Sequence, residues 1–252
     1  MKDILIINDF VSKGKIAGNM MTAVLSYKNY NTYFIPSALI SNSFSFGRLA
    51  SANTNSYLEE ALSVYTDIGF RFDAIFIGYI GDCNGLKIIR DFIDSLSYRP
   101  MILLDPIMGD NGKLYKSITD EKLAIYKKAL KLADIILPNY TEAKFLGIDD
   151  FESLLGSEKK YVVTSVNDAG DFYNLGISDK LHRASFEKLS IKMSGTGDLF
   201  DALFLHYYLD TDDFSLAIDS SVRVIDKIIR KHMKTHPNEV DIYIESYLDL
   251  ID

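Results

Sequence analysis

The amino-acid sequence predicts one α/β domain of three layers, in which a central, mostly parallel sheet is flanked by helices. Short apolar runs alternate with helical patterns through most of the chain, as in sheets whose parallel strands are joined by crossover helices. The composition is that of an ordinary globular protein, with 48% hydrophobic and 25% charged residues. Because no low-complexity linker, repeat or composition shift interrupts residues 1–252, a single domain is the economical interpretation.

The order of the predicted elements supports this class. Apolar runs predict strands at 4–8, 32–36, 74–79, 101–105, 134–138 and 161–166. Helical patterns lie at 17–29, 57–69, 85–97 and 119–133, and a further helix opens at Thr141. Short alternating segments between 171 and 192 predict antiparallel hairpins. From 196 onward the pattern is helical, with an apolar helix, an amphipathic run near 213–235 and a last helix near 239–250.

Charge and cysteine content exclude several classes of partner. A net charge of −8 argues against general affinity for nucleic acid or anionic membranes, because both require clustered cations. The single cysteine, Cys83, has no internal disulfide partner, which favours a reducing compartment. No apolar segment is long enough to cross a bilayer, and the first apolar run is too short for a signal peptide. We therefore expect a cytoplasmic location.

Polar residues follow the predicted strands at their carboxyl ends, where open α/β sheets bind ligands. These residues are Asn8, Asp9, Tyr79, Asp105, Asn139, Glu142, Thr164 and Ser165. Each alone has a plain explanation as a turn or capping residue, but their accumulation at one edge favours a ligand site. Asp105 precedes a proline, which favours an extended backbone, so its carboxylate can reach a cation or phosphate. Glu142 either interacts favourably with the dipole of the helix that begins there or holds Mg²⁺ through water.

The stretch SGTGD at 194–198 has two interpretations. Asp198 could simply cap the apolar helix that follows. Alternatively, Gly195 and Gly197 let backbone N–H groups converge on an anion at the positive end of that helix. A carboxylate beside a phosphate is a poor binder but a suitable base for the proton of an acceptor hydroxyl. The short motif alone favours capping.

Five blocks of the sequence, taken together, resemble the pyridoxal kinases of the ribokinase superfamily. The blocks are IGYIGD (77–82), LLDPIMGDNGKLY (103–115), ILPNYTEAKFLG (136–147), VVTSV (162–166) and SGTGDLFDALF (194–204). The resemblance covers nearly the whole chain from INDFVSKGK (7–15), and it is strongest to the bacterial pyridoxine/pyridoxamine kinase branch. It implies a ribokinase-like fold and transfer of a phosphoryl group from ATP to the 5′-hydroxymethyl group of pyridoxal, pyridoxine or pyridoxamine.

The resemblance also implies the catalytic roles. Asp198 matches the acid that activates the hydroxyl, and the backbone of Gly195, Thr196 and Gly197 matches the segment that stabilises the transferring group. Asp105 and Glu142 match the acids that organise Mg²⁺ and its waters around the nucleotide phosphates. A requirement for a monovalent cation stays open.

The binding roles follow in the same way. Tyr79 matches the aromatic residue that borders the vitamin ring, and Asn139 matches the nucleotide side of the crevice. Thr164 and Ser165 match the strand end near the phosphates. The family resemblance further suggests a homodimer.

The chain departs from the family pattern at several positions. Asp9 stands where several relatives have serine, so it either binds a cationic group of the vitamer or caps a turn. Phe44 occupies the neighbourhood of the ring where relatives often have threonine. Leu137 replaces a threonine of the cation region, and Ser194 replaces a cysteine, which argues against a thiol adduct with the aldehyde.

Two alternatives remain at this level. Hydroxymethylpyrimidine kinase has the same fold and chemistry, although such enzymes often have cysteine where Asp198 closes the GTGD motif here. A sugar kinase is disfavoured for the same reason. A non-catalytic sensor of the vitamer or nucleotide would have little use for a base aimed at a hydroxyl.

Overall fold

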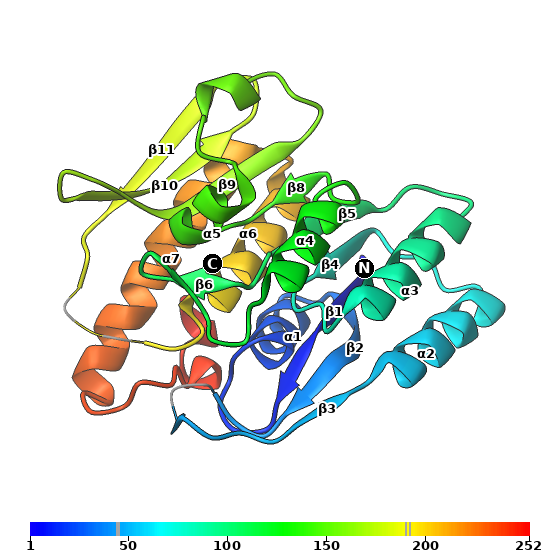
Figure 1. Cartoon of the computed structure of the whole chain (residues 1–252). Helices are drawn as coiled ribbons and strands as arrows, with labels where there is room; N and C mark the ends of the chain where they lie inside the picture. The colour runs from blue at the N-terminus through cyan, green and yellow to red at the C-terminus, as the bar shows by residue number, and fades with distance from the viewer. Residues whose placement is uncertain (44–45, 190, 192) are drawn as a thin grey trace.

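A sheet of mixed direction crosses the whole molecule in the computed structural model, which describes residues 1–43, 46–189, 191 and 193–252. Within these residues the strand order is β11-β10-β9-β8-β5-β4-β1-β2-β3, with helices on both faces (Figure 1). The strands are β1 (Asp3–Val11), β2 (Asn31–Ile40), β3 (Ser51–Asn53), β4 (Ala74–Ile77), β5 (Met101–Leu104), β8 (Ile135–Ile136), β9 (Lys160–Asp168), β10 (Asp171–Ile177) and β11 (Leu181–Phe186). A separate ribbon pairs β6 (Gly109–Asp110) with β7 (Lys113–Leu114).

The helices alternate with the strands as the sequence predicts. They are α1 (Gly18–Tyr27), α2 (Asn55–Ile68), α3 (Cys83–Ser95), α4 (Asp120–Ala129), α5 (Tyr140–Leu146), α6 (Thr196–Thr211) and α7 (Phe214–Thr235). Short 3₁₀ turns lie at η2 (Glu152–Leu154), η3 (Ile244–Ser246) and η4 (Leu248–Leu250). In the described part of the chain, no helix is both long enough and apolar enough to span a membrane.

The middle of the sheet is parallel and its edges are antiparallel. The parallel part runs from β9 through β8, β5, β4 and β1 to β2. The predicted hairpin region forms β10 and β11, which pair antiparallel with β9 and with each other. At the other edge β3 pairs antiparallel with β2. The predicted α/β class and the mostly parallel sheet are therefore confirmed.

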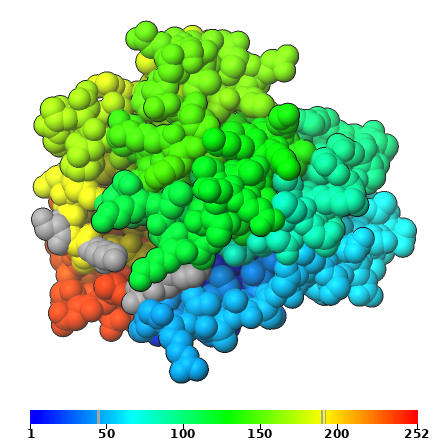
Figure 2. Space-filling view, in the orientation of Figure 1, coloured from blue at the N-terminus to red at the C-terminus, as the bar shows by residue number. Residues whose placement is uncertain are grey.

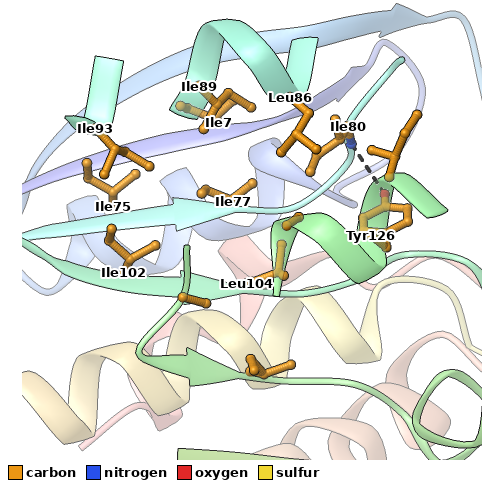
Figure 3. Close-up of a cluster of buried hydrophobic side chains, with 14 of the residues drawn as sticks. Ile7, Ile75, Ile77, Ile80, Leu86, Ile89, Ile93, Ile102, Leu104 and Tyr126 are labelled. Atoms are coloured by element: carbon orange, nitrogen blue, oxygen red, sulfur yellow. Dashed lines mark hydrogen bonds between the residues drawn. The ribbon is translucent and has the colours of Figure 1, made fainter. Parts of the chain in front are cut away.

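Two hydrophobic cores lie on the two faces of the sheet, because neighbouring residues of a strand point to opposite faces. Ile7, Ile77 and Leu104 belong to the core under α2, α3, α4 and α5, part of which Figure 3 shows. Ile6 and Phe76 belong to the opposite core under α1, α6 and α7. The central strands are buried on both faces, which explains their nearly continuous apolar runs.

The predicted last helix near 239–250 is wrong. Ile244, Tyr247 and Ile251 are buried, and their spacing is that of a helix face, so the apolar pattern alone does not distinguish a helix from the observed structure. The segment instead contains η3 and η4. Tyr247 anchors it, because its hydroxyl group lies 3.1 Å from Nδ1 of His232 and 2.9 Å from Nδ1 of His236.

The same C-terminal segment fixes the approach to α6. The Ser194 N–H donates to the Val240 carbonyl at 2.8 Å, and Ser194 forms a parallel bridge with Asp241. Asp241 in turn pairs with Lys13 at 2.9 Å.

In space-filling view, the blue N-terminal part and the green middle part of the chain meet on the face shown (Figure 2).

Candidate active site

The GTGD turn forms the start of α6 and requires glycine at its first position. Gly195 has a φ of 82°, in the left-handed region that favours glycine. A Cβ atom there would also lie 3.0 Å from the carbonyl oxygen of Lys15. A Cβ atom on Gly197 would meet no atom within 4 Å, so space is open beside this backbone. The first N–H groups of a helix have no carbonyl partner within it, so this turn can bind an anion, as the sequence predicts.

Asp198 is partly buried at this turn and contacts the start of α1. Its carboxylate accepts hydrogen bonds from the backbone N–H of Ala17 and from its own N–H. Ala17 adopts a φ of 54° just before α1, a conformation that L-residues adopt rarely. Burial raises the pKa of Asp198 above its usual value. A carboxylate with a raised pKa holds a transferred proton more readily, as a general base requires.

The structure brings four acids from three segments together. Asp105 follows β5, Glu142 lies in α5, and Asp198 and Asp201 lie in the first turns of α6. Burial and then the charges of Asp201, Glu142 and Asp198 raise the pKa of Asp105 well above its usual range. The juxtaposition of Asp105, Glu142 and Asp198 that the sequence predicts is therefore present. Such a concentration of buried negative charge requires protons or cations for compensation.

Glu142 is held by a complete capping box at the start of α5. Its Oε1 accepts the N–H of Met108 at 2.8 Å and of Gly109 at 3.2 Å, and its Oε2 accepts the N–H of Asn139 at 2.9 Å. The Asn139 side chain accepts from the backbone of Thr141 and Glu142, and its amide donates to the Gly109 carbonyl at 2.7 Å. Burial raises the pKa of Glu142 to about 7 despite these three donors. Both residues thus tie α5 to the loop after Asp105.

A second group of polar residues lies at the end of β1. Asp9 is 8% exposed, and burial followed by the charge of Asp198 raises its pKa to about 7. Asn8 is fully buried, and its Oδ1 accepts the N–H of Tyr79 and of Asp9, both at 2.9 Å. A Cβ atom at Gly78 would overlap with the Asn8 amide. The end of β1 and the GY segment are therefore held together, and Asp9 is close enough to Asp198 for its charge to act on it.

Lys122 of α4 supports the GY segment from the other side. Its Nζ donates to the carbonyls of Ile80 and Gly81 and lies 4.1 Å from the centre of the Tyr79 ring. Lys122 is 7% exposed, and burial lowers its pKa to about 8. Ile80 also donates its N–H to the buried Tyr126 hydroxyl at 3.3 Å (Figure 3).

The remaining predicted residues lie further along the same sheet edge. Thr164 forms a parallel bridge with Asn139, and its N–H donates to the Pro138 carbonyl at 2.9 Å. Ser165 has a φ of 57° and donates its N–H to the buried Asn174 side chain at 3.0 Å. Phe44 lies outside the described residues.

Three residues of this site are not among those predicted from the sequence. Asp201 lies in a stretch that reads as an apolar helix, and one acid among LFDALFLHYYL is itself a signal. Tyr115 interacts electrostatically with Glu142 and the neighbouring acids. Lys122 carries no signal in the sequence, because an occasional lysine is ordinary in an amphipathic helix.

Several proteins named pyridoxal kinase are similar to this chain in sequence. No family model matches the chain. A candidate pyridoxal kinase of Schizosaccharomyces pombe is 28% identical over an alignment of 239 residues, and the match covers 84% of this chain and 69% of that protein. The chain is related to the pyridoxal kinases. The similarity to this fungal relative does not show to which branch the chain belongs. Membership of the bacterial pyridoxine/pyridoxamine kinase branch stays a prediction.

Solved structures of pyridoxal kinases and their neighbours share the fold. Pyridoxal kinase of Lactobacillus plantarum has a TM-score of 0.90 at 20% identity, over 100% of this chain and 96% of that chain. A candidate phosphomethylpyrimidine kinase of Bacteroides thetaiotaomicron, solved with pyridoxal, has a TM-score of 0.89 at 24% identity with the same coverage. Pyridoxal kinase of Leishmania donovani, in complex with ADP and pyridoxamine, has a TM-score of 0.84 at 19% identity, again with the same coverage. The predicted ribokinase-like fold is therefore confirmed.

The acids also meet the requirements of a hard cation. No group of three or more His, Cys, Asp or Glu side chains in the described ranges forms a ready metal cage. Mg²⁺ seldom uses such a cage, and it is usually held by one or two carboxylates together with water and substrate phosphates. Asp105 interacts electrostatically with Asp201, Glu142 and Asp198, and a buried carboxylate oxygen of Asp201 has no hydrogen-bond partner in the described part of the chain. The donor set therefore fits Mg²⁺.

Proposed function

We propose that this chain is an ATP-dependent kinase that phosphorylates the 5′-hydroxymethyl group of pyridoxal, pyridoxine or pyridoxamine. The observation that carries the proposal is the position of Asp198. It lies at the anion-binding start of α6 and interacts electrostatically with Asp105 and with Asp9. Asp198, as the base, thus lies beside a phosphate-binding turn and near polar side chains that can bind the acceptor. The relationship to pyridoxal kinases supports the same reaction.

In this mechanism Asp198 takes the proton of the acceptor hydroxyl while the oxygen of that hydroxyl bonds to the γ-phosphorus of ATP. The bond between the γ-phosphorus and the β,γ-bridging oxygen breaks, and ADP leaves. The backbone of Gly195, Thr196 and Gly197 stabilises the negative charge of the transferring group, as expected for a reaction that depends on positioning and charge. Asp105 and Glu142 would hold Mg²⁺ and its waters, which neutralise phosphate charge when bound.

The acceptor is placed at the β1 end of the site. Tyr79 borders the vitamin ring, and its position is fixed by Asn8 and Lys122. Asp9 is the group that accepts a hydrogen bond from a cationic part of the vitamer. Phe44 is proposed to lie near the ring on the basis of the sequence alone.

The nucleotide lies on the β8–β9 side of the site. Asn139, Thr164 and Ser165 are its proposed contacts. Asn139 and Thr164 are neighbours through their bridge, and this supports a shared role. Leu137 lacks the hydroxyl that relatives place beside a monovalent cation, so such a requirement stays open.

Three further properties belong to the proposal. We treat residues 1–252 as a single domain, because one sheet runs from β3 to β11 through the described residues. We propose a homodimer on the basis of the family resemblance. We propose a cytoplasmic location, to which the unpaired Cys83 is suited.

The test is a coupled assay of ADP release. The protein is incubated with ATP, Mg²⁺ and, in separate reactions, each B6 vitamer or hydroxymethylpyrimidine. ADP release with at least one B6 vitamer, with the phosphate ester identified by mass spectrometry, is the expected result. ADP release only with the pyrimidine would establish the rival kinase. No release with any acceptor would favour a sensor.

A further inference from the structure

Asp201 is a buried acid in a helix that is otherwise apolar. The side chain is 3% exposed, and every residue of α6 from Leu199 to Tyr208 is buried. A buried carboxylate without compensation is costly. Asp201 lies three residues after Asp198, so the two project from the same side of α6. Its carboxylate therefore points toward the active site rather than into the core.

The environment of Asp201 contains acids rather than donors. Its carboxyl group lies within hydrogen-bonding distance of the Asp105 carboxyl group. Its Oδ2 atom is buried, and no hydrogen-bond partner reaches it within residues 1–43, 46–189, 191 and 193–252. The charges of Asp198 and Glu142 also act on Asp201, and both are negative. The oxygen therefore lacks the compensation that buried polar atoms normally have.

Glu142 differs from Asp201 in this respect. Its two carboxylate oxygens accept three backbone N–H groups between them. These contacts hold the carboxylate in the capping box of α5 and turn its oxygens toward the backbone. Asp201 has no such backbone contact among its described interactions. Of the two acids beside Asp105, Asp201 is therefore the one with a buried oxygen that no described donor pairs.

We propose that Asp105 and Asp201 form a divalent-cation site in which both carboxylates coordinate the ion directly, and that this site binds the ion before any nucleotide is present. The inference rests on the proposed function, because it assigns the metal ligands of that reaction. It refines the Mg²⁺ site of the proposed function: Asp201 supplies the second direct carboxylate ligand, whereas Glu142 acts on the waters of the ion and orients the loop that follows Asp105.

The chemistry of the ion agrees with this arrangement. Two carboxylates supply hard oxygen ligands, and Mg²⁺ keeps several waters that can later be exchanged for phosphate oxygens. The cation would also remove the repulsion between Asp105 and Asp201 and pair the free oxygen of Asp201. We therefore expect the metal to bind with useful affinity to the protein alone and to raise its thermal stability.

The experiment titrates the nucleotide-free protein with Mn²⁺ and measures free Mn²⁺ by electron paramagnetic resonance at neutral pH. The expected result is one bound Mn²⁺ that Mg²⁺ displaces. Asp201→Asn should weaken Mn²⁺ binding by about tenfold or more and should abolish most of the rise in Tm that Mn²⁺ gives the wild type. Asp201→Ala serves as a second variant, since it removes the carboxylate without introducing an amide.

Asp210→Asn is the matched control. It lies exposed near the end of the same helix and changes the net charge equally, so Mn²⁺ affinity should change by no more than about twofold, because solvent screens exposed charges. Wild-type affinity for Mn²⁺ in both Asp201 variants would overturn the proposal, as would a wild type that binds no Mn²⁺ without nucleotide. A protein that binds Mn²⁺ through Asp201 but releases no ADP would leave this site intact and remove the proposed function.

Discussion

Asp198 lies at the point where the phosphate-binding turn, the start of α1 and the other acids meet. Its carboxylate accepts the Ala17 N–H and lies at the positive end of α6. An amide at this position keeps the shape of the side chain but cannot take a proton. Asp198→Asn should therefore lower kcat by about 100-fold or more while changing the Kd for pyridoxal little.

Steady-state ADP release and equilibrium titration with pyridoxal, measured on the same preparation, separate these two effects. A variant that turns over at nearly the wild-type rate would remove Asp198 from the role of base. A variant that loses turnover and vitamer binding together would instead indicate that Asp198 holds the turn in place.

Asp9 makes a specific prediction about pH and stability. Its pKa in the folded protein is about 7, above the value of 3.8 for an exposed aspartate, because of burial and the charge of Asp198, and despite Lys122. The folded state thus binds this proton more tightly than the unfolded state. The stabilisation is present below about pH 4 and is lost as the pH rises toward about 7.

Asp9→Asn has no proton to lose and should escape this loss. Relative to the wild type, its free energy of unfolding should increase by about 2 to 4 kcal/mol between pH 4 and pH 7, since one pKa unit corresponds to about 1.4 kcal/mol. Urea denaturation of both proteins at several pH values measures this difference. A difference that stays constant with pH would show that Asp9 is not buried as a titrating group.

At the level of elements, the segment after β4 is held by a side chain from α4. Lys122 donates to the carbonyls of Ile80 and Gly81, and charged hydrogen bonds of this kind contribute about 1.5 to 3 kcal/mol. Lys122→Met keeps the apolar stem and loses the donor. The KM for the vitamer should rise about tenfold, because Tyr79 is then less firmly placed, whereas the KM for ATP should change little.

Initial-rate kinetics with each substrate varied in turn measures this split. Lys127→Met is the matched control, since it lies exposed on the same helix and should alter neither constant. An equal rise in both KM values for Lys122→Met would contradict a specific role of α4 at the vitamer end.

The elements could be predicted from the sequence wherever local pattern and tertiary packing agree. The central strands and the hairpin of β10 and β11 were predictable because apolar runs and alternation follow directly from burial. The strand predicted at 134–138 is shorter in the structure, where β8 is only Ile135–Ile136. Its length depends on pairing with β5 and β9, which the apolar pattern does not encode. The prediction of a helix near 239–250 is wrong because the conformation depends on contacts of Tyr247 with His232 in α7 and with His236 just after it, which the local apolar pattern does not encode.

Only part of the site could be predicted from the sequence. Strand ends in a parallel sheet converge, so the proximity of Asp105, Glu142 and Asp198 follows from topology. Asp201 and Lys122 act from inside helices, where each position has many possible neighbours. Which neighbour they have depends on how α6 and α4 pack, and a single sequence does not contain that information.

At the level of the whole molecule, stability depends on two cores that share the same strands. Phe204 is fully buried in the core under α6 and α7, with its ring centre 6.1 Å from that of Phe200 and 5.7 Å from those of Tyr208 and Phe214. Phe204→Ala should lower the free energy of unfolding by about 3 to 5 kcal/mol. Urea denaturation monitored by far-UV circular dichroism measures this loss.

Tyr57→Ala is the comparison for this variant, because the ring is 52% exposed on α2. It should change the free energy of unfolding by about 0.5 kcal/mol or less. Similar losses for the two variants would mean that the aromatic cluster around Phe204 is loosely packed.

The bond from the Ser194 N–H to the Val240 carbonyl has a consequence for biosynthesis. Residues 240–247 leave the ribosome after the whole sheet and after α1, α6 and α7, yet they fix the segment that leads into Gly195. A nascent chain can therefore bury most of its apolar surface while the phosphate-binding turn is still untethered. Folding and catalytic competence should be acquired in that order, and the kinase should become active only after translation has passed Tyr247.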